Sequence, residues 1–163
     1  MSEEIKKGLL GIVVDETTIS HVVPELSALT YRGYTVQELC DKCDFEEVAY
    51  LVLHGELPNK SQLRKFIKEE RSNRKLSSQI LKDIKKMPKN AHPMDVIRTC
   101  VSLMALEDKD TKDNSPKANM RKAMRIFAKT PTAVAAYFRS RKGKSVISPS
   151  KNLSFSENFF KMM

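Results

Sequence analysis

Hydrophobic residues change their spacing along the chain, and this change divides the sequence into two parts. Residues 9–23 are rich in β-branched side chains such as Ile12, Val13 and Val22, which favour extended structure. From about Val36 onward the apolar positions recur every three to four residues, which is the period of helices. The pattern predicts an all-α protein with a short N-terminal β-hairpin or extended arm. It assigns the β arm and turn to residues 1–35 and the helical part to residues 36–163.

Start and stop signals divide the helical part into segments. Asp44 opens a helix as a side-chain cap, and Gly55 closes it. Pro93 suits the first turn of a helix, because its missing N–H would have no partner there. Thr130-Pro131 is expected to kink or break a helix, since proline disfavours helical geometry in the residue before it. The expected helices cover residues 36–43, 45–54, 59–74, 77–87, 93–106, 117–128 and 132–141, with a further apolar segment over 154–163.

The expected helix over residues 93–106 is apolar on two faces. One stripe consists of Met94, Ile97, Val101 and Met104, and the other of Val96, Cys100 and Leu103. A helix with two apolar faces is typical of a buried position. We therefore expect this helix to lie between layers of the fold.

The net positive charge of the chain makes polyanions such as nucleic acids partners to consider. The chain of 163 residues has 29 Lys and Arg against 20 Asp and Glu, a net charge of +9, with the excess concentrated in residues 60–89 and 117–163. We interpret these runs as the solvated faces of amphipathic helices, because the interleaved aromatics of single-strand nucleic-acid binders are missing. Nucleic acid is therefore not an expected partner.

The apolar runs and the first residues of the chain bear on its location. No apolar run approaches the roughly 20 residues that a membrane span needs. The opening residues 1–7 contain acids and no apolar leader segment. We expect no membrane partner and a cytoplasmic setting.

Cysteines and histidines are the residues most suited to metal or redox chemistry. Cys40 and Cys43 form a CxxC, and Cys100 makes an odd third cysteine, so we expect reduced thiols. A structural zinc site needs four ligands, and no second pair is present. The three histidines are scattered, at His21, His54 and His92. The sequence therefore predicts no metal site, and we expect the cysteines to serve packing.

Four segments, taken in order and with sensible spacing, resemble the amino-terminal part of citrate synthases and 2-methylcitrate synthases. They are LTYRGYTVQEL (29–39), FEEVAYLVLHGELP (45–58), HPMDVIR (92–98) and AKTPTAVA (128–135). The stretch LSFSENFF (153–160) is similar to the segment that leads into the core of the family's large domain. The resemblance covers about residues 8–163. It implies that residues 36–163 belong to the helical large domain of a homodimer whose chain is more than twice this length.

The resemblance also implies a reaction. In the family, an aspartate removes a proton from acetyl-CoA or propionyl-CoA, histidines stabilise the enolate and polarise oxaloacetate, and water releases CoA. The family's segments that carry these groups have no counterpart here, so we assign no catalytic residue and expect the chain alone to be inactive. We expect these segments to follow Met163 in a longer chain, with acyl-CoA as substrate and no bound cofactor.

A few residues could still contact a ligand. His54 precedes Gly55 at an expected helix end, and we interpret it as structural. His92 is the expected cap of the helix that follows it, with contact to a nucleotide effector as its alternative, as in some bacterial relatives. Arg32 could clamp an anion or pair with a local carboxylate in a turn.

The cofactor-binding residues stay unassigned. Basic residues that could reach the phosphates of CoA from one subunit to the other are Lys6, Lys7, Arg121, Lys122 and Arg125, and no motif fixes that assignment. Two other function classes stand beside the synthase. One is a freestanding, non-catalytic module that associates with a homologous subunit through the 94–106 helix, and the other is a basic nucleic-acid-binding protein.

Overall fold

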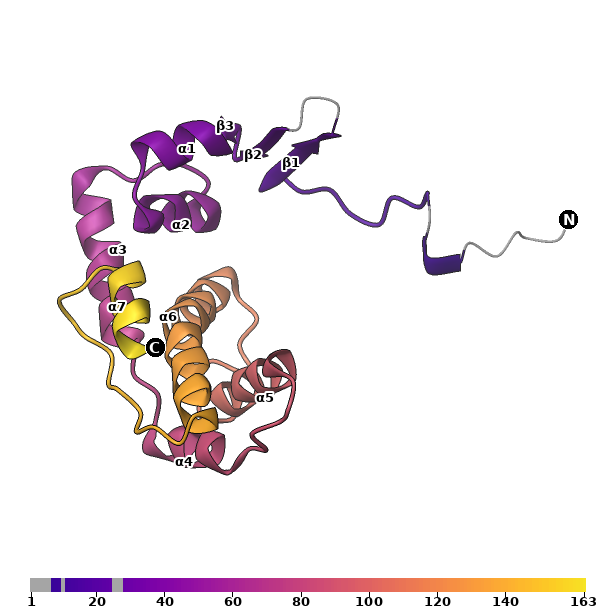
Figure 1. The fold of residues 1–163 in the computed structure, drawn as a ribbon. Coiled ribbons are helices and arrows are strands. Elements are labelled where there is room, and N and C mark those ends of the chain that lie inside the picture. Colours follow the sequence, from indigo (N-terminus) through magenta and orange to yellow (C-terminus); the bar gives the residue numbers. More distant parts are fainter. Residues whose placement is uncertain (1–6, 10, 25–27) are drawn as a thin grey trace, which may run out of the picture.

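The computed structural model describes residues 7–9, 11–24 and 28–163, and in them it shows a mainly helical fold with one small sheet (Figure 1). The N-terminal elements are a 3₁₀ turn, η1 (Lys7–Leu9), and the strands β1 (Ser20–Val23), β2 (Ala28–Tyr31) and β3 (Tyr34–Thr35). The helices are α1 (Val36–Lys42), α2 (Phe45–His54), α3 (Lys60–Asn73), α4 (Ser78–Lys86), α5 (Pro93–Leu106), α6 (Pro116–Arg141) and α7 (Phe155–Met162). The predicted fold class is confirmed. None of the helices in the described ranges is long and apolar enough to cross a bilayer.

The three strands form an antiparallel meander in the order β1-β2-β3. β1 and β2 pair from Ser20 opposite Tyr31 to Val23 opposite Ala28. A two-residue turn joins β2 to β3, and both of its residues have left-handed backbones, Arg32 with φ 50° and Gly33 with φ 90°. Such paired positive φ angles match the twist of a tight hairpin and explain the glycine. The β-branched residues at 12–14 lie outside the sheet, in an irregular and exposed segment that extends away from the helices (Figure 1).

The core forms around α6, which lies among α3, α4, α5 and α7 (Figure 1). One buried cluster joins α4, α5 and α6, and its members are Leu76, Ile80, Ile84, Val96, Cys100, Met104, Ala133, Ala136 and Tyr137. A smaller cluster of Tyr50, Phe66 and Met124 joins α2, α3 and α6. Small alanine side chains on α6 allow its neighbours to approach closely, and they explain how one helix can serve several partners.

α6 runs unbroken from Pro116 to Arg141, so the predicted break at Thr130-Pro131 is wrong. Proline inside a helix removes one backbone hydrogen bond and costs about 3 kcal/mol. The residues on both sides of it are packed, since Ala128, Thr132 and Ala133 are each at most 2% exposed. Tertiary burial therefore outweighs the local preference of proline.

The two predicted apolar stripes of α5 are buried or half-buried at every position except Met94, where the prediction of burial is wrong. Val96, Cys100 and Met104 point into the core, whereas Met94 is 58% and Leu106 is 84% exposed. The helix packs on α4 and α6. The side of α5 that faces away from the core also carries exposed polar residues such as Asp95 and Arg98.

Truncation of a core side chain tests this packing. We expect Ile84→Ala, at a position 1% exposed, to lower the free energy of unfolding by about 2–5 kcal/mol, because it leaves a cavity between α4 and α6. Ile126→Ala, at a position 40% exposed, should cost less than about 1 kcal/mol. Urea denaturation followed by circular dichroism measures both. Equal losses in the two variants would contradict the packing described here.

Candidate functional site

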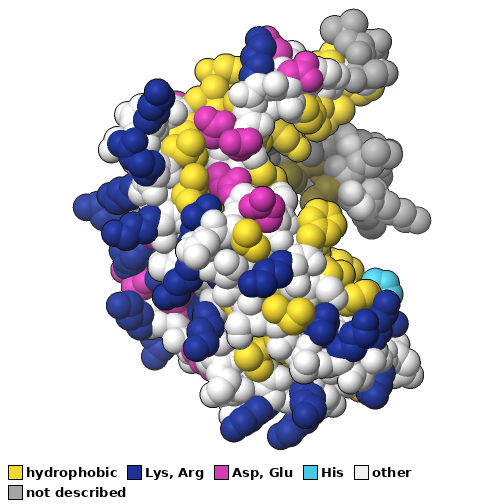
Figure 2. Space-filling view, turned by 60° about the vertical axis from the view of Figure 1, so that its left-hand side comes forward, with side chains coloured by type: hydrophobic (Ala, Val, Ile, Leu, Met, Phe, Trp, Pro, Cys, Tyr) yellow, Lys and Arg dark blue, Asp and Glu magenta, His cyan; other side chains and the backbone are white. Residues whose placement is uncertain are grey.

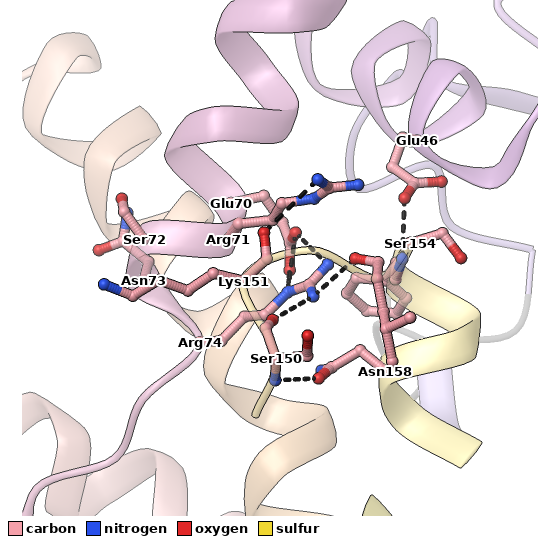
Figure 3. Close-up of polar contacts among 12 residues, drawn as sticks. Glu46, Glu70, Arg71, Ser72, Asn73, Arg74, Ser150, Lys151, Ser154 and Asn158 are labelled. Atoms are coloured by element: carbon pink, nitrogen blue, oxygen red, sulfur yellow. Dashed lines mark hydrogen bonds and ion pairs between the residues drawn. The ribbon is translucent and has the colours of Figure 1, made fainter. Parts of the chain in front are cut away.

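A buried ion pair fastens the C-terminal segment to the helical core (Figure 3). Glu70 lies in the last turn of α3 and Arg74 is the cap residue at its C-terminal end, and the two are 0% and 1% exposed. The Arg74 guanidinium donates from Nε to Glu70 Oε1 at 2.8 Å and from the second terminal nitrogen to Oε2 at 2.7 Å. Its other terminal nitrogen donates to the carbonyls of Ser150 at 2.8 Å and Leu153 at 3.0 Å. The Arg74 side chain thus binds one carboxylate and two backbone carbonyls of the segment before α7.

Three further polar side chains complete the same junction. Asn158 on α7 accepts a hydrogen bond from the Ser150 N–H at 2.7 Å, and Glu46 on α2 accepts one from the Phe155 N–H at 2.8 Å. The Thr132 hydroxyl of α6 donates to the Arg74 carbonyl at 2.8 Å. Glu46, Thr132 and Asn158 are each at most 6% exposed. We name these three residues, together with Glu70 and Arg74, the buried polar junction. Because its polar groups bond to one another and to the backbone, its role is structural and not catalytic.

Aromatic stacking covers the junction on one side. The Phe155 ring stacks on Phe45 with centroids 4.6 Å apart and on Phe127 at 4.7 Å. These rings come from α7, α2 and α6, so they bring together the two ends of the described helical part. Stacked aromatic pairs contribute about 0.5–1.5 kcal/mol beyond their buried area.

The arginines considered for CoA phosphates are already engaged. Arg125 donates to Asp108 at 2.7 Å and to Asp110 at 2.6 Å, and Arg121 donates to Asp110 at 2.8 Å. Hydrogen bonds from Arg121 and then Arg125 hold the pKa of the Asp110 carboxyl well below its usual range. These four residues fix the connection between α5 and α6.

Of the lysines considered for CoA phosphates, Lys122 lies beside that ion-pair cluster, whereas Lys6 and Lys7 belong to the N-terminal end of the chain. Lys122 donates from Nζ to the Asp113 carbonyl at 2.7 Å, which caps the same connection. Lys7 belongs to η1, and Lys6 lies outside the described residues. The structure therefore brings Arg121, Lys122 and Arg125 together, but with protein acceptors and not as a free anion site.

The remaining candidate ligands also have structural partners. His92 caps α5, as predicted, by accepting the Met94 N–H on Nδ1 at 3.2 Å. His54 ends α2, as predicted, and stacks on Tyr50 at 4.1 Å. Arg32 donates to the Thr18 hydroxyl at 2.6 Å and to the Val52 carbonyl at 3.1 Å. Within the described part of the chain no carboxylate pairs with Arg32, and this arginine ties the β2-β3 turn to α2.

The cysteines divide into one packing residue and two others. Cys100 is buried in the core, as predicted, and burial raises the pKa of its thiol. Cys40 is exposed, so its predicted packing role is wrong: Leu39 takes the buried face of the short helix α1. Cys43 is half-buried, and burial is the first cause that raises its thiol pKa. Within the described ranges no three His, Cys, Asp or Glu side chains gather as metal ligands.

Sequence reasoning missed the buried polar junction, although one signal was present. Leu63, Phe66 and Ile67 are apolar and recur at helical spacing on α3, and Glu70 and Arg74 continue the same stripe. An acid and a base four residues apart form a helical pair, and their place on the inward face predicts a buried one. Asn158, Thr132 and Glu46 carry no comparable signal, because their contacts join segments far apart in sequence.

Replacing one partner of the buried pair tests its energetic weight. We expect Arg74→Met to lower the free energy of unfolding by about 3–5 kcal/mol, because the Glu70 carboxylate is left buried without a partner. Arg98→Met is the matched control, since its pair with Asp95 is exposed at 79% and 64%, and it should cost less than about 1 kcal/mol. Urea denaturation of both variants decides, and a loss at Arg74 no larger than that at Arg98 would contradict the junction.

The depressed pKa of Asp110 predicts a dependence of stability on pH. A carboxyl whose folded pKa lies below its unfolded pKa of about 4 stabilises the fold above that value, and the contribution is lost as pH falls through the folded pKa. We expect wild type to melt at a higher temperature than Asp110→Asn at pH 6, with the difference shrinking between pH 4 and pH 2. Thermal melts across this range measure it, and a constant difference would argue against the pairing.

Comparisons with known proteins identify relatives of this helical structure. The family model described as "Citrate synthase, C-terminal domain" matches residues 8–163. The chain is 47% identical over 159 residues to a 2-methylcitrate synthase of Mycobacterium tuberculosis, in an alignment that covers 98% of this chain and 40% of the relative. It is 47% identical over 158 residues to a citrate synthase of Mycolicibacterium smegmatis, covering 97% of this chain and 42% of that one.

Solved structures agree with the sequence relatives. The crystal structure of citrate synthase from Thermotoga maritima superposes with a TM-score of 0.84 at 37% identity, covering 98% of this chain and 41% of that one. The structure from Pyrobaculum aerophilum gives 0.89 at 32% identity, covering 96% and 41%. The chain thus spans about 40% of the length of the relatives it matches. With its family model matched over nearly all residues, the chain belongs to the citrate synthase family.

Proposed function

We propose that this chain is the amino-terminal framework of a citrate synthase or 2-methylcitrate synthase and acts as part of a longer polypeptide. The alignment that covers 98% of this chain and 40% of a 2-methylcitrate synthase carries the proposal. The polypeptide would join the α-carbon of acetyl-CoA or propionyl-CoA to the carbonyl carbon of oxaloacetate. The α-carbon loses a proton, a carbon–carbon bond forms, and water cleaves the thioester to release CoA. The setting we propose is cytoplasmic.

The chemistry of the described residues supports a framework role and not a catalytic one. Within residues 28–163 the ion pairs join arginine to aspartate or glutamate and involve no histidine. His54 and His92 are engaged at a helix end and a helix start. General acid–base catalysis needs a positioned proton donor and acceptor within reach of the substrate. In this proposal, the rest of the polypeptide supplies both.

The outer face of α5 supports assembly as a homodimer. Met94 and Leu106 are largely exposed, one near each end of the helix, so both large apolar side chains are available to a partner subunit. The same observation favours a second candidate function, a non-catalytic module that associates through α5 with a homologous synthase subunit. The two candidates differ in the length of the native polypeptide.

The mass and activity of the native protein test the proposal. An antibody against residues 60–89 should capture from cell extract a species more than twice 18.6 kDa. That species should release CoA from acetyl-CoA or propionyl-CoA only when oxaloacetate is present, whereas the 163-residue chain alone should release none. A native species of 18.6 kDa that copurifies with a longer synthase subunit would overturn the framework proposal in favour of the second candidate.

A further inference from the structure

α4, the end of α6 and the segment after it line a half-open cavity of about 590 Å³. The proposed synthase reaction assigns this cavity no role. Its floor is apolar: Leu81 of α4 and Val146 present accessible surface, and Ile84 of α4 and Ala136 of α6 lie buried beneath them. Its rim carries Lys82, Lys85, Lys89 and Lys144. We name this cavity with its four rim lysines the lysine pocket.

Hydrogen bonds to α6 hold both walls of the lysine pocket. The Tyr137 hydroxyl donates a hydrogen bond shared between the carbonyls of Pro88 at 2.8 Å and Ala91 at 3.1 Å, which fixes the turn that carries Lys89. On the other side, the Lys144 N–H donates to the Arg139 carbonyl at 2.9 Å, and Arg139 Nε donates to the Ser145 carbonyl. Two lysines from separate segments are therefore held against one rigid helix.

The positive charge at the rim is uncompensated. All four lysines are exposed, and none forms an ion pair with an acid of the described residues. Asp83, on the same helix, accepts instead from Gln79 at 3.0 Å. Residues 60–89 contain eleven basic and three acidic side chains, and Lys and Arg gather along one edge and at the lower end of the face in Figure 2. Several like charges around one cavity concentrate anions there.

A structural explanation covers only part of this cluster. Lys85 lies in the last turn of α4, where a cation is favoured by the carbonyl groups at the helix end. Lys89 and Lys144 lie outside the helices, so this reason does not apply to them. The helix end therefore does not account for the convergence of Lys82, Lys89 and Lys144 on one apolar floor, whereas binding of an anion would.

We propose that the lysine pocket binds a small organic anion with two or more negative charges on an apolar or aromatic body. The lysine rim selects for multiple charge, and the accessible side chains of Leu81 and Val146 select for an apolar body. A second basic cavity, of about 640 Å³, provides the comparison: it is lined by Arg64, Ile67, Lys68, Arg71, Ser72 and Lys151, and Ile67 is its one apolar residue.

Fluorescence titration with pyrene-1,3,6,8-tetrasulfonate, a rigid aromatic tetra-anion, tests the proposal on the 163-residue chain. We expect saturable binding that Lys85→Gln/Lys144→Gln weakens about fivefold or more, since each exposed charge contributes a modest factor. The matched control, Lys68→Gln/Lys151→Gln, removes the same charge from the other cavity and should change the affinity less than about twofold. Circular dichroism confirms that the exposed replacements leave the fold intact.

Two further readouts separate the lysine pocket from a general attraction to positive charge. Val146→Ser should weaken the pyrene probe about threefold and leave binding of inorganic tripolyphosphate unchanged, because only the aromatic body uses the apolar floor. Equal losses in the two lysine double variants would overturn the proposal, as would tripolyphosphate binding as tightly as the pyrene probe. Absence of saturable binding would do the same.

Discussion

The buried pair of Glu70 and Arg74 is the contact on which the C-terminal third of the structure depends. An ion pair removed from water is favourable only when every donor and acceptor finds a partner. Here the guanidinium spends its remaining hydrogen bonds on the Ser150 and Leu153 carbonyls, so a segment without regular structure acquires a fixed path. α7 can then place Phe155 on the rings of α2 and α6. A polar contact thus sets where an apolar surface is buried.

The sequence predicted the elements well because their signals are local. Caps at Asn59, Ser77 and Ser154 and the left-handed Gly55 lie where residue type and helical period place them. Such features depend on neighbours three or four residues away, and a single chain displays them in full. The family resemblance added the fold, because motifs in the right order carry information that no single helix contains.

The errors have one physical origin, since each depends on what packs against a residue from elsewhere. Pro131 stays helical because the α6 positions around it are buried against several helices. Cys40 faces outward because Leu39 occupies the inward side of α1. The lysine rim likewise joins two segments some sixty residues apart, Lys82 and Lys144. Helical periodicity gives the direction of a side chain and not the identity of what meets it.

The length of chain between the partners of the buried polar junction has a consequence for the order of folding. Glu46 bonds the Phe155 backbone across 109 residues, and Arg74 bonds Ser150 across 76. The contacts among α4, α5 and α6 form between segments much closer in sequence, so less loop entropy is lost in making them. During synthesis the central helices can therefore associate while residues 144–163 are still emerging from the ribosome. Closure of the C-terminal segment is then the late step that buries the charges of Glu70 and Arg74.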